Sequence, residues 1–167
     1  EERRIIHGNI KAENFVFASN SSLLDIVLID FGHSTFMMDN QLNYDKIDSV
    51  PHRAPEVRNG EGFNHLSDSW SLGYLTYEML SGLQPTFDLD YRPIFYQDMY
   101  SDVSFKALNF IERLLSKDIS QRMSVKEALH HDFITKYSVQ SNNRRSLLKP
   151  STDRWQNNIT CIILAGG

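Results

Sequence analysis

Two short polar stretches hold the residues of this 167-residue chain whose types and spacing could do chemistry. The first is residues 7–14, His-Gly-Asn-Ile-Lys-Ala-Glu-Asn, and the second, Asp-Phe-Gly, begins sixteen residues after Asn14. Asn14 and Asp30 both offer side-chain oxygens, which are the ligands that hard cations such as Mg²⁺ prefer. The plain alternative is a hairpin flanked by polar residues that have no chemical role.

Two β-type runs connect these stretches. Residues 15–17 and 26–29 are rich in β-branched and aromatic side chains, and a turn rich in Ser and Asn at 19–22 separates them. We therefore expect a small hairpin that begins beside Asn14 and ends where the second polar stretch starts. The segment 30–56 has little periodicity and is expected to be one long loop.

Three patterns further along the chain predict helices. Residues 66–80 are apolar nearly all round, which is typical of a buried helix. Residues 104–115 carry an amphipathic stripe, with Ser104 as the expected N-cap. Ser124 is expected to cap a shorter helix, because Glu127 stands at the capping-box position. The chain is thus predicted to be mainly α, with helices packed on a small hairpin.

Composition limits the class of protein. Hydrophobic residues make up 41% and charged residues 23%, as in an ordinary globular domain. The net charge of −4 and the short apolar runs lead us to expect neither nucleic acid nor membrane as a partner. The single cysteine, Cys161, excludes an internal disulfide framework and fits a reducing compartment. The histidines beyond position 7 have no metal-ligand spacing and are expected to be packing or surface residues: His33, His52, His65, His130 and His131.

The two polar stretches resemble the catalytic loop and the metal-binding motif of protein kinases. Their spacing matches His-Arg-Asp-Leu-x-x-x-Asn followed by Asp-Phe-Gly. Residues 54–56, Ala-Pro-Glu, resemble the motif that ends the kinase activation segment, which here would span the 27 residues 30–56. Residues 68–73, Asp-Ser-Trp-Ser-Leu-Gly, resemble the Asp-x-Trp-Ser-x-Gly motif of a buried kinase helix.

This resemblance implies a phosphate-handling site. In protein kinases the residues at the positions of Asn14 and Asp30 hold Mg²⁺ with ATP, and the residue at Lys11 contacts the transferred phosphate. Asn9 stands where these enzymes have the Asp that accepts the proton of the substrate hydroxyl. An amide cannot accept that proton at neutral pH, and general-base help is typically worth about 10²- to 10⁴-fold in rate. We therefore expect phosphotransfer to be absent or strongly impaired.

The resemblance also implies a structural frame around the site. Asp68 would hold the backbone of the catalytic loop, and Glu56 would pair with Arg122. A buried pair of this kind fixes geometry more than it adds stability, whereas the alternative leaves both residues as solvated surface charges. Three further motif residues are expected to be structural: His7, Phe31 and Gly32.

Other positions depart from the kinase pattern. Gly8 replaces the Arg that binds an activation-segment phosphate, so phosphorylation of Ser34, Thr35 or Ser49 would lack its usual partner. Asp48 replaces the Gly expected before Ser49. These changes count against an intact peptide site as well as against an intact base.

The resemblance divides the chain into two expected parts. Residues 1–136 would be a partial kinase domain, the α-helical C-terminal lobe with a small β-hairpin at the catalytic loop, from an α+β fold whose N-terminal lobe is absent. ATP and Mg²⁺ would bind only if that lobe were supplied, and the helix at 66–80 would expose apolar surface. Residues 137–167 would be a regulatory-type tail. We expect the whole to be a piece of a larger cytosolic protein.

The subfamily likeness is to the calmodulin-dependent kinase group. Residues 75–85, 101–118 and 127–134 are similar to that group's later helices. Residues 144–148 and 153–156 resemble the regulatory tails of titin-like, obscurin-like and death-associated kinases. Within residues 144–164, an apolar 1-5-10 spacing predicts a calmodulin-binding helix, formed by Trp155, Ile159 and Leu164. The favoured alternative is an amphipathic tail that docks on the lobe and inhibits it.

Three functional hypotheses follow. The leading one is a Ser/Thr-type pseudokinase that acts as a scaffold or docking module for a protein partner, in a cytoplasmic, cytoskeletal or sarcomeric setting. The second is a working kinase that transfers the γ-phosphate of ATP to Ser or Thr of a protein substrate, with Asn9 only positioning the hydroxyl. The third is a degenerate fragment without a function of its own.

Overall fold

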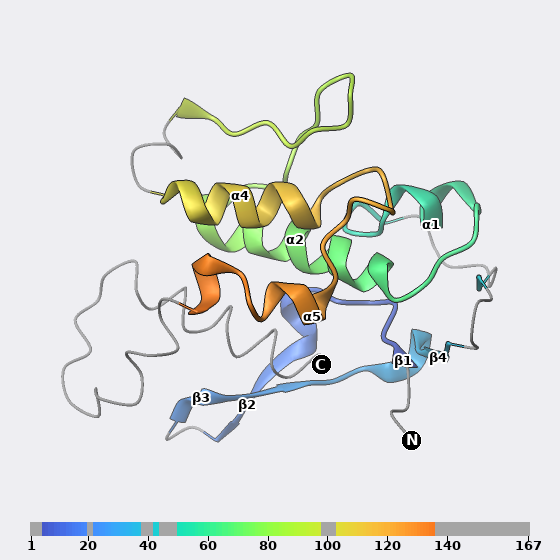
Figure 1. Ribbon diagram of the computed structural model, residues 1–167. Helices are drawn as coiled ribbons and strands as arrows, with labels where there is room; N and C mark the ends of the chain where they lie inside the picture. Colours follow the sequence, from blue (N-terminus) through green and yellow to red (C-terminus); the bar gives the residue numbers. More distant parts are fainter. Residues whose placement is uncertain (1–4, 20–21, 38–41, 44–49, 98–102, 136–167) are drawn as a thin grey trace.

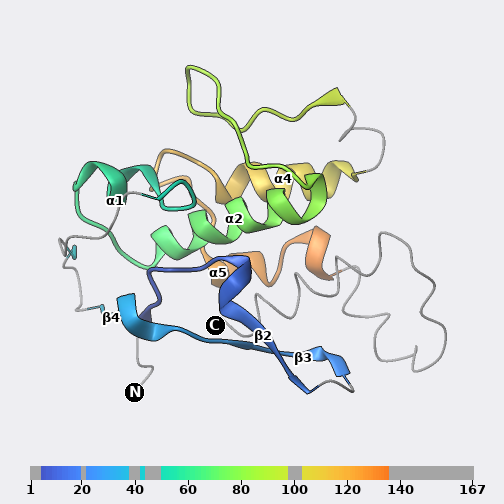
Figure 2. The same ribbon diagram turned by 180° about the vertical axis from the view of Figure 1, so that it is seen from behind.

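A central helix organises the described part of the chain. The computed structural model describes residues 5–19, 22–37, 42–43, 50–97 and 103–135. Helix α2 (Leu66–Ser81) lies in the middle, and α4 (Phe105–Leu114) packs along one side of it. Helix α5 (Val125–Ala128) and the hairpin of β2 and β3 lie on the other side, and α1 (Pro55–Asn59) lies near the start of α2 (Figures 1 and 2).

The predicted hairpin is confirmed. Strands β2 (Phe15–Ser19) and β3 (Ser22–Leu28) pair antiparallel, with Phe15 opposite Leu28. The prediction of one long loop over residues 30–56 is wrong, because that segment contains a 3-10 turn, a short strand and the start of α1. The strand, β4 (Thr35–Phe36), pairs with β1 (Ile5–Ile6). Two residues are too few to show the alternation of apolar and polar side chains by which a strand is predicted.

Helix α2 is buried on all sides because it separates two apolar clusters. Leu72 and Leu75 face a cluster that includes Phe110 and Phe133. On the other side lies the second cluster, which consists of Ala54, Trp70, Tyr74, Tyr77, Ile111 and Leu115. Within the helix, the buried Thr76 hydroxyl donates to the Leu72 carbonyl oxygen at 2.8 Å. The prediction of a buried helix is confirmed, and the prediction that this helix exposes apolar surface is wrong.

Several exposed apolar side chains lie instead on the hairpin and the short strands, while others, such as Leu89 and Phe105, lie elsewhere. Half of the Phe17 side chain is exposed (50%), and Phe36 is more exposed still (69%). The other exposed members of the first group are Ile5, Val16, Val27, Ile29 and Phe31. The strands β1 to β4, which carry most of these residues, lie on the side of α2 away from α4 (Figure 1).

Capping interactions fix the ends of the later helices. The Ser104 hydroxyl accepts the N–H of Ala107 at 3.3 Å and so caps α4. At α5 the Ser124 hydroxyl accepts the N–H of Glu127 at 3.2 Å, and the Glu127 carboxylate accepts the N–H of Ser124 at 2.8 Å. Both capping predictions are confirmed, because the side-chain oxygens satisfy N–H groups that a helix start leaves unpaired.

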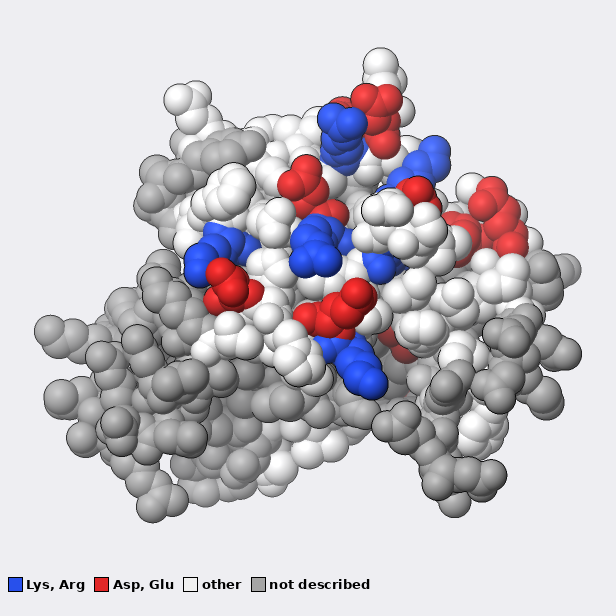
Figure 3. All heavy atoms as spheres, in the orientation of Figure 1, with Lys and Arg blue, Asp and Glu red and all other residues white. Residues whose placement is uncertain are grey.

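Charges of both signs share the face shown in Figure 3. Lys and Arg side chains stand beside Asp and Glu side chains there, and Lys106 forms an exposed ion pair with Asp132 at 2.7 Å. None of the helices within the described ranges has the length and hydropathy required to cross a lipid bilayer. The predicted tail, residues 137–167, lies outside the described residues.

Gly73 permits the close approach of α2 and α4. A Cβ atom at this position would lie 2.7 Å from Leu114 Cβ and 3.0 Å from Leu115 Cγ. We predict that Gly73→Ala lowers the free energy of unfolding by about 1–3 kcal/mol, because the two helices must move apart. Chemical denaturation of the purified protein measures this loss. The exposed helical change Lys126→Ala is the control, expected within about 0.5 kcal/mol of wild type, and equal stability of both variants would contradict the packing argument.

Candidate functional site

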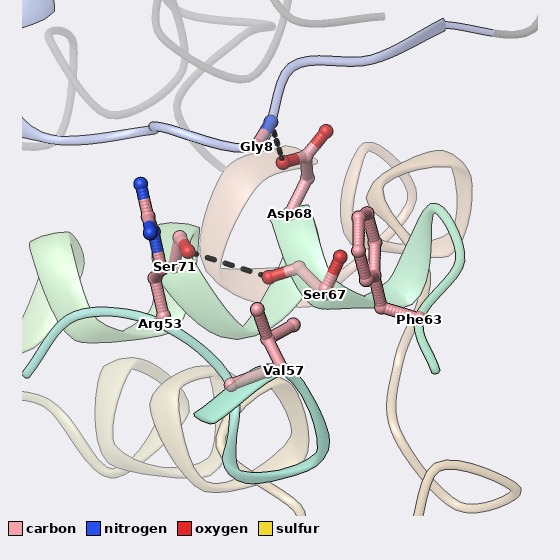
Figure 4. Close-up of a pocket in the computed structure, with 8 residues that line it drawn as sticks. Gly8, Arg53, Val57, Phe63, Ser67, Asp68 and Ser71 are labelled. Atoms are coloured by element: carbon pink, nitrogen blue, oxygen red, sulfur yellow. Dashed lines mark hydrogen bonds between the residues drawn. The ribbon is translucent and has the colours of Figure 1, made fainter. Parts of the chain in front are cut away.

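The carboxylate of Asp68 holds the backbone of residues 7 and 8. Asp68 lies in the first turn of α2, and its two oxygens accept the N–H of His7 at 2.7 Å and the N–H of Gly8 at 2.9 Å. Burial raises the pKa of this carboxyl, and the two N–H donors oppose that rise. A cavity of only about 10 Å³, lined also by Phe63 and Ser71, adjoins the contact (Figure 4). The bond pair is therefore nearly dry, and its geometry is rigid.

Gly8 adopts a backbone conformation that suits glycine. Its φ is +75°, in the left-handed region, and a Cβ atom there would lie 2.8 Å from the His33 carbonyl oxygen. The preceding ring is also fixed, because His7 Nε2 donates to the Ile29 carbonyl oxygen at 3.2 Å and the ring packs edge-on against Phe31 at 4.8 Å. This packing ties the first polar stretch to the second.

The side chains at positions 9, 14 and 30 come together at the end of the hairpin. The Asn14 amide donates to the Asn9 carbonyl oxygen at 2.7 Å, and the Asn14 carbonyl accepts the N–H of Ile29 at 2.8 Å. Asp30 follows in the left-handed region (φ 66°), which Asp tolerates better than most residues. The Asn9 amide nitrogen then donates to Asp30 Oδ2 at 3.2 Å. Pairing of β2 with β3 thus brings both polar stretches to one point.

A family model for the protein kinase domain matches residues 2–134. The chain belongs to the protein kinase family. It is 34% identical over 140 residues to CDPK-related kinase 3 of Arabidopsis thaliana, which covers 78% of this chain and 23% of that protein. It is 30% identical over 155 residues to myosin light chain kinase A of Dictyostelium discoideum, covering 87% of this chain and 52% of that protein.

A third relative is serine/threonine-protein kinase 17A of Oryctolagus cuniculus, 29% identical over 146 residues. That alignment covers 81% of this chain and 37% of the relative. The chain therefore spans between about a quarter and about half of the length of these curated relatives. It is a fragment of a Ser/Thr-type kinase domain, with relatives in the calmodulin-dependent group.

Glu56 and Arg122 form a buried, two-pronged ion pair in this kinase domain. Arg122 Nη1 lies 2.6 Å from Glu56 Oε1, and Nη2 lies 2.9 Å from Oε2. The guanidinium also donates to the carbonyl oxygens of Ser116 and Leu66, at 2.9 and 3.1 Å. The structure thus brings together two residues that are 66 positions apart, and their contacts join the start of α1, the start of α2 and the loop after α4.

The oxygens of Asn14 and Asp30 are the described atoms of this site that could hold a hard cation. The Asp30 carboxylate is exposed, while the Asn14 amide is buried and uses its nitrogen for the bond to residue 9. A Cβ at Gly32 would lie 3.3 Å from Asp30 Oδ1, so a side chain there would press on the carboxylate. Lys11 is half-buried directly before the 3-10 turn Ala12–Asn14. The donor set fits Mg²⁺.

His52 is the residue of this site that the sequence prediction missed. Its Nε2 lies 3.4 Å from Asn9 Oδ1, although the residue was expected to be only a packing or surface histidine. The hydroxyl of Ser71 donates to the His52 carbonyl oxygen at 3.0 Å, and the ring packs edge-on against Tyr74 at 6.5 Å. The signal available in the sequence was its place two residues before Ala54, in a segment that departs from the kinase pattern.

Removing one acceptor from Asp68 tests its role in holding the loop. Asp68→Asn replaces one oxygen by an N–H₂ group, which leaves a backbone N–H of His7 or Gly8 without its acceptor in a nearly dry site. We predict a loss of about 1–3 kcal/mol in the free energy of unfolding, measured by chemical denaturation. Asp90→Asn, an exposed Asp, is the control and should leave stability unchanged. Equal stabilities would show that the bonds are replaced by water.

Removing one partner of the buried ion pair should cost more than removing both. Glu56→Gln leaves the guanidinium of Arg122 buried without a counter-charge, and we predict a loss of about 3–5 kcal/mol in the free energy of unfolding. The double change of Glu56→Leu with Arg122→Met removes both charges and should lose less than the single change. Thermal and chemical unfolding measure both variants. A double variant that is less stable than Glu56→Gln would contradict this account.

Proposed function

We propose that this chain is part of the C-terminal lobe of a Ser/Thr-type pseudokinase, which acts as a scaffold or docking module for a protein partner. One observation carries the proposal. The side chain at the base position is an amide, and its nitrogen donates to Asp30 Oδ2 at 3.2 Å. A carboxylate at position 9 has no proton to make that bond at neutral pH.

The amide at position 9 weakens phosphotransfer in two ways. Asn9 cannot take the proton of a substrate hydroxyl, so general-base help is lost. The same amide also occupies a lone pair of the Asp30 carboxylate, which is half of the proposed metal site with Asn14. Mg²⁺ bound with ATP supplies charge neutralisation for phosphoryl transfer. Asn14 and Asp30 are proposed to hold it, and Lys11 to contact the transferred phosphate.

The exposed face of the hairpin supports the lobe assignment. Val16 and Val27 lie opposite each other on the hairpin, and each is more than a third exposed. Exposed apolar side chains that gather on one face mark an interaction site, and an N-terminal kinase lobe is the partner that we propose to cover them. Binding of ATP would then require that lobe, since the Gly-rich loop and the strand Lys are not in this chain.

A working kinase is the second candidate, because the frame around the site is intact. The Asp68 bonds and the buried Glu56–Arg122 pair support this candidate, as do the side-chain oxygens of Asn14 and Asp30, which are suitable ligands for Mg²⁺. In this case the chain would transfer the γ-phosphate of ATP to Ser or Thr of a protein substrate, with Asn9 positioning the hydroxyl. The missing carboxylate favours the pseudokinase.

The tail and the setting of the protein are also proposals. We propose that residues 137–167 are a regulatory tail of the titin-like type that docks on residues 1–136. Calmodulin binding at 144–164 is the alternative, supported by the spacing of its three apolar anchors and by relatives in the calmodulin-dependent group. A cytoplasmic setting, cytoskeletal or sarcomeric, agrees with a chain that has a single cysteine.

Restoring the carboxylate tests the proposed function. In the full-length protein we predict weak transfer from ATP to Ser/Thr peptides for wild type, a rise of about 10²- to 10⁴-fold for Asn9→Asp, and no transfer for Asp30→Ala. Incorporation of labelled phosphate measures all three. Robust wild-type transfer that Asp30→Ala abolishes would refute the pseudokinase proposal and favour the second candidate. A rate that Asn9→Asp does not raise would show that the lost base is not the only defect.

A further inference from the structure

We infer that His52 is the proton acceptor for the residual phosphotransfer of this domain. The inference rests on the proposed function, an impaired kinase site that retains its frame. The usual base position holds an amide, and the imidazole of His52 is within hydrogen-bond reach of that amide at 3.4 Å. A histidine is the side chain whose charge changes nearest to neutral pH.

The orientation of Asn9 places the reacting hydroxyl beside His52. The amide nitrogen is bound to Asp30 Oδ2, so the amide oxygen faces His52 Nε2. A substrate hydroxyl beside this oxygen therefore lies within hydrogen-bond reach of the imidazole, and its single O–H turns from Asn9 Oδ1 to His52 Nε2 for the transfer. Contacts between a base and its substrate are often long before the substrate binds, so 3.4 Å is compatible with proton transfer. Asn9 positions the hydroxyl, and His52 takes its proton.

Helix α2 holds His52 in this place. The Ser71 hydroxyl fixes the backbone of His52 through the carbonyl oxygen, and Tyr74, one turn along, supports the ring. The same helix fixes the opposite side of the site, because Asp68 binds the backbone before Asn9. One rigid helix therefore positions both Asn9 and His52. A catalytic group must be held within a narrow range of positions, and a helix holds it more precisely than a loop does.

The surroundings favour the neutral imidazole. Burial lowers the pKa of His52, and the positive charges of Arg53 and Lys11 lower it further, while Glu13 acts in the opposite direction. Tyr74, the ring against His52, is uncharged at neutral pH, since burial raises its pKa. At neutral pH the ring is therefore in the form that can accept a proton, and it becomes inactive as the pH falls through the lowered pKa.

The step conserves atoms and charge. In the resting site the protonated Nε2 donates to Asn9 Oδ1. When the substrate hydroxyl takes the place of this contact, the neutral imidazole gives the Nε2 proton to solvent and takes one from solvent at Nδ1, which leaves Nε2 open. The O–H bond of the substrate breaks and its proton passes to Nε2. The oxygen forms a bond to the γ-phosphorus of ATP while the bond to the bridging oxygen breaks, and ADP leaves with that electron pair.

Substitution of His52 tests this role in the full-length protein, with labelled ATP and a degenerate Ser/Thr peptide library as probes. We expect His52→Gln to lower the residual rate about 10²-fold, the low end of general-base help, and to change the rate little when Asn9→Asp restores the carboxylate. His130→Gln, an exposed histidine just after α5, is the control and should match wild type. Unfolding temperatures verify that each variant is folded.

The pH dependence separates a proton acceptor from a structural residue. The wild-type rate should fall as the pH is lowered through the pKa of His52, and His52→Asp should move this fall to lower pH because a carboxyl titrates there. Wild-type transfer without such a fall, or equal to that of His52→Gln, overturns the inference while a kinase function stands. Complete absence of wild-type transfer at every pH also overturns it, and leaves the scaffold proposal standing. Robust wild-type transfer that depends on His52 refutes the pseudokinase proposal alone.

Discussion

The site depends on the two hydrogen bonds that the backbone N–H groups of His7 and Gly8 donate to the Asp68 carboxylate. They join the catalytic loop to the most buried helix of the fold, and they span 60 and 61 positions of the sequence. Because α2 also holds the loop before α1 through Ser71, the same element sets both walls of the site. By holding α2 on two sides, the apolar clusters thus fix the position of Asp68 and, through it, of the backbone at residues 7 and 8.

Local signals in the sequence predicted the elements that form by local rules. The hairpin, the buried helix and the capping box of Ser124 and Glu127 all follow from alternation, continuous hydrophobicity or a four-residue motif. The ladder between β1 and β4 was not predictable, because two residues per strand have no period. The sequence predicted exposed apolar surface on the helix at 66–80, whereas Phe17 and its neighbours on the hairpin are exposed. The apolar pattern of a helix does not show how later helices will pack against it and cover it.

The site was predictable as a set of residues and not as a set of contacts. Motif spacing identified Asn9, Asn14 and Asp30, but the bond from the Asn9 amide to Asp30 depends on side-chain direction at the end of a hairpin. His52 was missed for the same reason. It has no motif of its own, and only the fold of the segment before α1 brings it to Asn9. Motif spacing therefore identifies the residues that match a family's motifs, but it does not identify a residue such as His52 that joins the site from outside those motifs.

The backbone conformation at Gly8 limits which residues this loop can accept at position 8. With φ at +75° and the His33 carbonyl only 2.8 Å from the place of a Cβ atom, every other side chain would meet both strain and a clash. A left-handed backbone alone costs roughly 1–2 kcal/mol for a residue other than glycine. An arginine at this position would therefore be destabilising in the present loop conformation, whether or not a phosphate were there for it to bind. A side chain larger than hydrogen at position 8 therefore requires a different path for the whole loop, including the carbonyl of His33.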